Sequence, residues 1–257
     1  MTIINTGILL QASMSDEIPL IVEKEGNVLT LSLNNVEKRN ALTSEMMGAL
    51  SAILEDVNNY DNLRVIVIRG SGSVFCSGAD INTWNPEELQ ELLFSLSDCS
   101  IPTVAHVHGI CFGGGMGLAS ACDFVIAEKG TKFGFPEVKI GMIPAVISPY
   151  VSRKINIGRM RELFITGESF GVSRAYDFGF LYSLESDITN LIHKIKEGAP
   201  LAQSFIKKLL SDEVDIDYIK ERDSHLAELI TQIREGSEGQ EGMAAFMQKR
   251  SPSWREE

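Results

Sequence analysis

The sequence has few of the features that place a protein in a membrane or an oxidising compartment. It contains only four cysteines, Cys76, Cys99, Cys111 and Cys122, and none forms a Cys-x-x-Cys pair. Each lies in or beside an apolar or small-residue run, which predicts reduced, buried thiols and a reducing compartment, the cytoplasm. No apolar run reaches the roughly 18 residues of a membrane span, and residues 8–10 follow no lysine or arginine. We therefore expect no membrane span and no export signal.

Basic residues are also scarce. Lysine and arginine total 23 against 35 aspartates and glutamates, which gives a net charge of −12 at pH 7. This charge repels phosphate backbones and anionic lipids, so we expect neither a nucleic acid nor a membrane as a partner. Hydrophobic residues make up 44% of the 257 residues, enough for a substantial core without disulfides.

Strands are predicted at regular intervals in the first half of the chain. Residues 20–33 contain two extended runs around Gly26, which predicts a hairpin. Continuous apolar runs at 65–68, 103–108 and 124–127 predict strands buried on both faces, as in parallel sheets.

Helices are predicted between these strands. Thr43 or Ser44 can cap the first, Asn85 caps the second, and the third runs through residues 118–122. The alternation predicts an α/β fold with a mainly parallel sheet. Helical patterns then dominate residues 153–249, with Ser173 and Ser237 as further caps.

Two glycine-containing turns, residues 75–80 and 111–117, each follow a predicted strand and precede a helix. Small residues let the backbone approach a ligand, and helix N-termini present free N–H donors. Two such turns could converge on one oxygen and stabilise an enolate or a tetrahedral oxyanion. The alternative is that the glycines only permit tight packing.

Other motifs lack the residues or the structural context that their usual chemistry requires. The sequence has no P-loop lysine, and Leu118 stands where a dinucleotide fingerprint needs Gly or Ala. The Gly-x-Ser-x-Gly at residues 167–171 follows a predicted helix, whereas a serine nucleophile elbow follows a strand. His106 and His108 lack zinc-ligand spacing and are interpreted as core histidines, so no metal is predicted.

Glu137 is the acid with the most suggestive setting, because it follows aromatic residues and a proline at positions 133–136. Desolvation there could raise its pKa into the range of a general acid or base. An exposed loop glutamate is the alternative.

Several segments together resemble the crotonase (enoyl-CoA hydratase/isomerase) superfamily, in the family's order and spacing. They are residues 38–42, 75–80, 109–123, 133–137 and 241–254. The resemblance implies a spiral of ββα turns over residues 17–200, after an N-terminal extension at 1–16. It also implies a helical C-terminal region at 201–257 that assembles homotrimers or dimers of trimers. The substrate would be an acyl-CoA thioester, with no cofactor besides that CoA.

By the family's pattern, the N–H groups of Ser77 and Gly114 form the oxyanion hole, and Glu137 is the catalytic acid/base. The residues implied in substrate and CoA binding are Lys38, Ala41, Ser77, Gly78, Ala79, Asp80 and Gly114.

Two departures from the pattern are informative. Typical hydratases carry a second glutamate where this chain has Gly117, which puts the two-carboxylate mechanism in doubt. Residues 138–150 resemble the bacterial methylglutaconyl-CoA hydratases, whose substrate brings its own carboxylate. That carboxylate could orient a water molecule in the room that Gly117 leaves.

Three hypotheses follow. The first is a lyase that hydrates or dehydrates a branched or carboxylated enoyl-CoA. The second is a double-bond isomerase, because moving one proton needs one base. The third is a non-catalytic acyl-CoA-binding protein.

Overall fold

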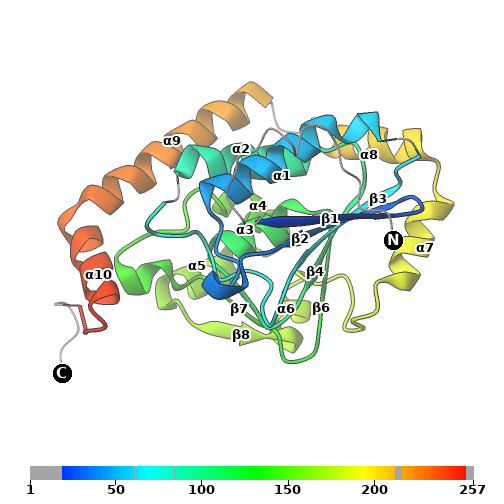
Figure 1. The fold of residues 1–257 in the computed structure, drawn as a ribbon. Helices are drawn as coiled ribbons and strands as arrows, with labels where there is room; N and C mark the ends of the chain where they lie inside the picture. Colours follow the sequence, from blue (N-terminus) through cyan, green and yellow to red (C-terminus); the bar gives the residue numbers. More distant parts are fainter. Residues whose placement is uncertain (1–18, 61, 84, 212–215, 253–257) are drawn as a thin grey trace.

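The larger of two sheets forms the centre of the molecule (Figure 1). The computed structural model describes residues 19–60, 62–83, 85–211 and 216–252. Within them, the sheet has the strand order β1-β2-β3-β4-β6. The bounds are β1 (Leu20–Glu25), β2 (Val28–Leu33), β3 (Val65–Gly70), β4 (Thr103–Val107) and β6 (Phe124–Ala127). The first two strands form the predicted antiparallel hairpin, and the other pairs are parallel, which confirms the mainly parallel α/β fold.

A second, smaller sheet was not predicted. It contains β5 (Ile110–Phe112), β7 (Lys132–Gly134) and β8 (Ser169–Gly171), with β5 parallel and β8 antiparallel to β7. The strand β8 lies inside the stretch predicted to be helical, so that prediction was wrong there. Each strand has three residues, too few for an alternating pattern, and their pairing depends on distant segments.

The first two helices begin where the sequence indicates. In α1 (Ser44–Asp56) the Thr43 hydroxyl accepts a hydrogen bond from the N–H of Met46 at 3.3 Å. In α2 (Pro86–Asp98) the Asn85 side chain accepts one from the N–H of Glu87 at 2.9 Å. Capping by local side chains explains why these two starts could be predicted. Helix α3 (Gly114–Ala121) begins four residues before the predicted stretch at 118–122, within the second glycine turn, and no side chain caps it.

The second half of the chain is mostly helical. Its elements are η3 (Pro136–Ile140), α4 (Ser148–Ser152), α5 (Ile157–Thr166), α6 (Val172–Asp177), α7 (Thr189–Glu197), α8 (Pro200–Ser211), α9 (Ile216–Glu235) and α10 (Ser237–Met247). The predicted caps Ser173 and Ser237 were wrong, because both lie inside their helices and Gly171 and Gly236 hold the cap positions.

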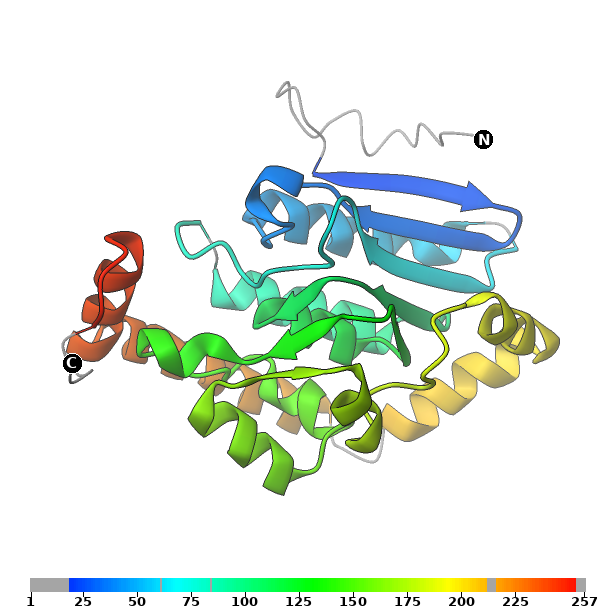
Figure 2. The same ribbon diagram turned by 90° about the horizontal axis from the view of Figure 1, so that it is seen from below.

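The C-terminal helices return to the core. Helix α9 packs against α2, and α10 packs against η3. Figure 2 shows α10 in red at one end of the molecule and α7 and α8 in yellow at the other. The predicted N-terminal extension, residues 1–16, lies outside the described residues.

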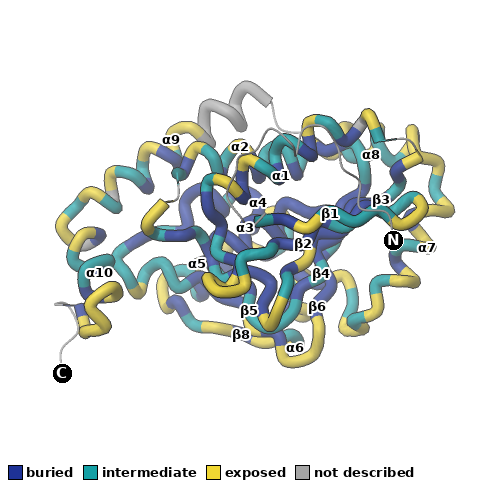
Figure 3. Tube along the Cα trace, viewed as in Figure 1, coloured by how far each residue is buried: buried dark blue, intermediate teal, exposed yellow. Residues whose placement is uncertain are grey.

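Buried residues are concentrated between the large sheet and helices α1 to α4 (Figure 3). Among the largest fully buried side chains are Tyr150, Phe75, Phe133, Phe135 and Phe180. All four cysteines are buried and free, as predicted. Within the described ranges, every helix is too short or too polar to cross a bilayer.

Candidate active site

The first glycine turn is held in place by backbone hydrogen bonds to two other segments. Cys76 N–H donates to the carbonyl of Ile110 at 3.1 Å, which aligns the turn with β5. Leu42 donates to the carbonyl of Gly78 at 2.8 Å, and Asp80 donates to the carbonyl of Leu42 at 2.9 Å. These bonds pin the peptide groups on both sides of residue 79.

The second turn leads into α3 through Gly113, whose φ of 50° is in the region that favours glycine. Its N–H donates to the carbonyl of Gly134 at 3.1 Å. Gly114 is the first residue of α3, so its N–H lacks an acceptor within the helix.

The two turns meet, as the oxyanion-hole hypothesis requires. A methyl group placed on Gly114 would lie 3.3 Å from the nitrogen of Ala79, and one on Gly113 would lie 3.7 Å from the Cα of Gly78. The absence of side chains at these glycines therefore leaves a small space bounded by both turns.

The free donor on the first turn is not the predicted one. Ser77 N–H donates to the carbonyl of Arg39 at 3.1 Å and is therefore engaged. The N–H of Ala79 has no acceptor among the described residues and lies on the side facing Gly114. This hydrogen bond argues against Ser77 as an oxyanion donor. The sequence contains no indication of this hydrogen bond, because its acceptor, the carbonyl of Arg39, lies 38 residues earlier in the chain.

Glu137 lies directly beside this space. It is in η3, and its Oε1 atom would be 3.3 Å from a methyl group on Gly113. Its Oε2 atom is buried and has no hydrogen-bond partner. Burial raises the pKa of Glu137 from 4.5 to about 7. A carboxyl group with this pKa exchanges protons readily near neutral pH, as a general acid or base must.

A cavity of about 780 Å³ connects the two turns and Glu137. Much of its wall is apolar. The apolar lining residues include Leu89, Ile140, Met142, Ile143, Pro144, Ala145, Val146, Ile147, Ile230 and Phe246. Ile230 and Phe246 come from α9 and α10, and Arg250 follows α10, so C-terminal residues that the sequence analysis did not assign to the site also line the cavity.

Basic side chains also line the cavity. Lys38 and Arg39 do so next to Ala41. The ammonium group of Lys38 is 2.9 Å from the buried carboxylate of Asp80, which raises the pKa of Lys38. The hydrogen bond from Lys38 also contributes to a lowered pKa of Asp80, against the opposing effect of its burial. The predicted CoA-binding residues thus all line this one cavity.

The buried side chain of Asn40 fixes the loop that carries these residues. Its amide nitrogen donates to the carbonyls of Ser71 and Val74, both at 2.9 Å. Its oxygen accepts a hydrogen bond from the N–H of Asn35 at 2.9 Å. Asn40 has a φ of 54°, which asparagine tolerates better than most residues.

The predicted room beside Gly117 does not exist. A methyl group on Gly117 would lie 2.4 Å from the Cγ2 atom of Ile147 and 3.2 Å from the Cδ1 atom of Leu93. Ile147 is only 3% exposed and fills this place. The sequence could not show this, because Ile147 is 30 residues away and its packing depends on the tertiary structure.

The remaining motifs lie elsewhere. Ser169 is exposed and follows the end of α5, where Gly167 has a φ of 58°, as predicted for a helix terminus rather than a nucleophile elbow. His108 Nε2 is 3.1 Å from the carbonyl oxygen of Gly72, and neither His106 nor His108 lines the cavity.

Comparison with known proteins identifies the family. The enoyl-CoA hydratase/isomerase family model matches residues 23–257. The 2,3-dehydroadipyl-CoA hydratase of Escherichia coli K12 is 30% identical, over 92% of this chain and 98% of its own. An enoyl-CoA isomerase/hydratase of Mycosarcoma maydis is also 30% identical, over 88% and 91%.

Solved structures show the same fold. An enoyl-CoA hydratase from Mycobacterium avium superposes with a TM-score of 0.85 at 28% identity, covering 93% of this chain and all of its own. The family match spans the two turns, Glu137 and the C-terminal helices that line the cavity. This chain therefore belongs to the enoyl-CoA hydratase/isomerase family, the crotonase superfamily.

Proposed function

We propose that this protein adds water to, and removes it from, the α,β double bond of an acyl-CoA thioester. Glu137 serves as both acid and base, and the N–H groups of Ala79 and Gly114 form the oxyanion hole. The observation that carries the proposal is one buried carboxyl group, with a pKa of about 7, beside two converging unpaired N–H donors. Fixed donors of this kind stabilise the charge that develops on a thioester oxygen.

Hydration needs one water and one carboxylate. Glu137 removes a proton from the water, and the resulting hydroxide forms a bond to Cβ. The electron pair of the double bond moves through Cα to the thioester oxygen, where Ala79 and Gly114 hold the enolate. Protonated Glu137 then returns its proton to Cα, which regenerates the carboxylate. Dehydration follows the same steps in reverse.

The proposed substrates are branched or carboxylated enoyl-CoA esters such as methylglutaconyl-CoA. The segment at 138–150, which suggested this class, forms much of the apolar wall. Lys139 and Arg250 also line the cavity and supply positive charge near it. The E. coli relative is named for 2,3-dehydroadipyl-CoA, whose acyl group ends in a carboxylate.

The test uses the purified full chain with methylglutaconyl-CoA and crotonyl-CoA while the enoyl absorbance is followed. We expect turnover of methylglutaconyl-CoA, and a loss of at least about a hundredfold in Glu137→Gln. Absence of turnover with both esters would contradict the proposal. Binding without turnover would instead support an acyl-CoA-binding protein.

A second candidate is a double-bond isomerase. The observation that favours it is the apolar packing beside Gly117, which leaves Glu137 as the carboxylate next to the oxyanion turns. A 1,3-proton shift needs only one base, which takes the proton from one carbon and returns it to another. Incubation of a 3-enoyl-CoA in D₂O separates the two, because an isomerase yields a 2-enoyl product without net hydration.

We also propose that the chain forms homotrimers or dimers of trimers. Five apolar residues of α8 are more than half exposed, and exposed apolar clusters mark interaction surfaces. They are Leu201, Phe205, Ile206, Leu209 and Leu210. Sedimentation should give three or six times the chain mass of 28.3 kDa, whereas a monomer at micromolar concentration would contradict this.

A further inference from the structure

Gly117 lies in α3, and its N–H donates to the Gly113 carbonyl at 3.2 Å. The atom nearest to a methyl group at position 117 would be Cγ2 of Ile147. Ile147 lines the cavity together with Glu137. A side chain at position 117 would therefore point toward this wall of the cavity.

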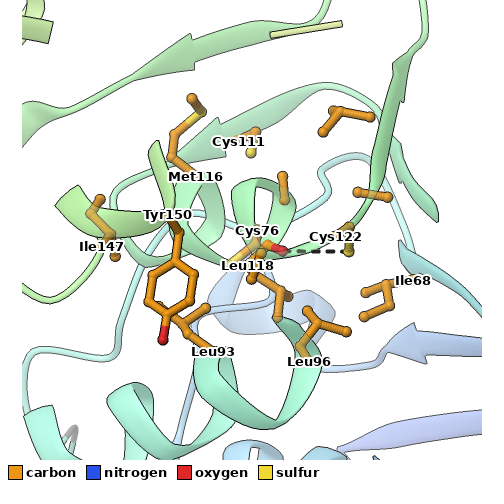
Figure 4. Packing of buried hydrophobic residues seen from close by; sticks show 14 of the residues in the cluster. Ile68, Cys76, Leu93, Leu96, Cys111, Met116, Leu118, Cys122, Ile147 and Tyr150 are labelled. Carbon is orange, nitrogen blue, oxygen red and sulfur yellow. Dashed lines mark hydrogen bonds between the residues drawn. The ribbon is translucent and has the colours of Figure 1, made fainter. Parts of the chain in front are cut away.

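Ile147 occupies the space that such a side chain would need. Its Cγ2 atom would be 2.4 Å and its Cβ atom 2.9 Å from a methyl group at position 117. Both contacts are shorter than side chains tolerate, and Cβ cannot rotate away. Ile147 belongs to the same packed cluster as Leu93 and Tyr150 (Figure 4), so the surrounding core holds it there.

Ile147 also separates Gly117 from the cavity. Ile147 is a lining residue of the cavity, as Glu137 is, whereas Gly117 is not among the described residues that line it. Both Ile147 and Leu93 are almost fully buried. The wall at this point is thus an aliphatic surface that offers no hydrogen bond to water.

We propose that Ile147 is a specificity-determining residue, which keeps a second acid/base group and ordered water away from the wall next to position 117. The inference deepens the proposed function and rests on it. With Ile147 in place, every proton must pass through Glu137. The site is then restricted to reactions that one carboxylate can serve, and unbranched enoyl-CoA esters without a polar group of their own are hydrated slowly.

The first test measures packing alone and needs no activity. The variants are G117A, I147A and the double variant, compared by thermal unfolding at one protein concentration. Overpacking of this size should lower the Tm of G117A by about 2–12 °C. The double variant should be more stable than the sum of the two single shifts predicts. Additive shifts would overturn the proposed occupancy.

A matched control is available in Ile143, which lines the same cavity. The three atoms nearest to a methyl group at position 117 belong to Ile147 and Leu93, and none of them belongs to Ile143. The pair G117A and I143A should therefore behave additively. Equal coupling at Ile143 and Ile147 would also contradict a specific role for Ile147.

The second test measures the reaction. We compare G117E/I147G with G117Q/I147G and the wild type, using crotonyl-CoA in D₂O. The freed space lets the new carboxylate reach the cavity, so in G117E/I147G the ratio of the hydration rate to the deuterium-exchange rate should rise at least about tenfold above the wild-type ratio. The amide in G117Q/I147G opens the same space but cannot serve as a base, so this control should not show the rise. An unchanged ratio in G117E/I147G overturns the proposal.

The outcomes distinguish the two levels of inference. If the wild type turns over neither ester, the proposed function fails, while the alanine cycle still decides whether Ile147 fills the space. If the wild type is active and G117E/I147G behaves like G117Q/I147G, the role of Ile147 fails and the proposed function stands. If G117E/I147G does not fold, the alanine cycle alone decides.

Discussion

Replacement of Glu137 by glutamine should make the protein more stable at alkaline pH while it abolishes activity. Burial raises the pKa of this carboxyl from 4.5 to about 7, so the folded state prefers the protonated form. Between pH 4.5 and 7 the folded state binds more protons than the unfolded state, and stability falls as the pH rises. The difference between a pKa of 4.5 and one of about 7 corresponds to up to about 3 kcal/mol. Above pH 7 this cost is present in full.

Glutamine has nearly the same shape and carries no charge, so it avoids this cost. At pH 5 the wild type and Glu137→Gln should have similar free energies of unfolding. At pH 8.5 the variant should be more stable by up to about 3 kcal/mol, or about 6–12 °C in Tm for a chain of this size. Denaturant or thermal unfolding at both pH values, at one protein concentration, measures the difference.

The same titration should govern the rate. Both directions of the proposed reaction begin with ionised Glu137, so kcat/KM should rise with an apparent pKa of about 7. The free energies of unfolding of Glu137→Gln and the wild type could instead change in parallel from pH 5 to 8.5. That result would show that burial imposes no ionisation cost on Glu137, and it would refute the raised pKa.

Three further substitutions probe the scaffold around the site. Asn40→Ala leaves buried carbonyls without a donor and should lower the free energy of unfolding by about 2–4 kcal/mol; a change below about 0.5 would contradict this. Asp123→Ala removes the acceptor of the Lys207 ammonium group and should cost about 2 kcal/mol by denaturant titration, with an unchanged midpoint as the contrary result. Lys38→Ala should raise KM for CoA esters about tenfold at constant kcat, whereas Asp80→Asn, which leaves the ammonium group in place, should raise it less.

The structural features that depend on residues close together in the chain could be predicted from the sequence. Thr43 and Asn85 cap helices through hydrogen bonds to residues two or three positions away, so the helix starts followed from local patterns. The apolar runs of β3, β4 and β6 indicated buried parallel strands for the same reason. The setting of Glu137 after aromatic residues and a proline indicated a desolvated carboxyl group, and its raised pKa agrees.

The sequence by itself determined the α/β fold, the two glycine turns and the acid beside them, because these follow from local propensities and from a distinctive set of motifs. Only the tertiary structure decided which N–H group remains free, since the loop carbonyl of Arg39 engages Ser77 and leaves Ala79 open. It also decided that the space beside Gly117 is filled, because Ile147 reaches it through the packed core. Hydrogen-bond competition and steric exclusion act between segments far apart in the chain, so spacing along the sequence does not encode them.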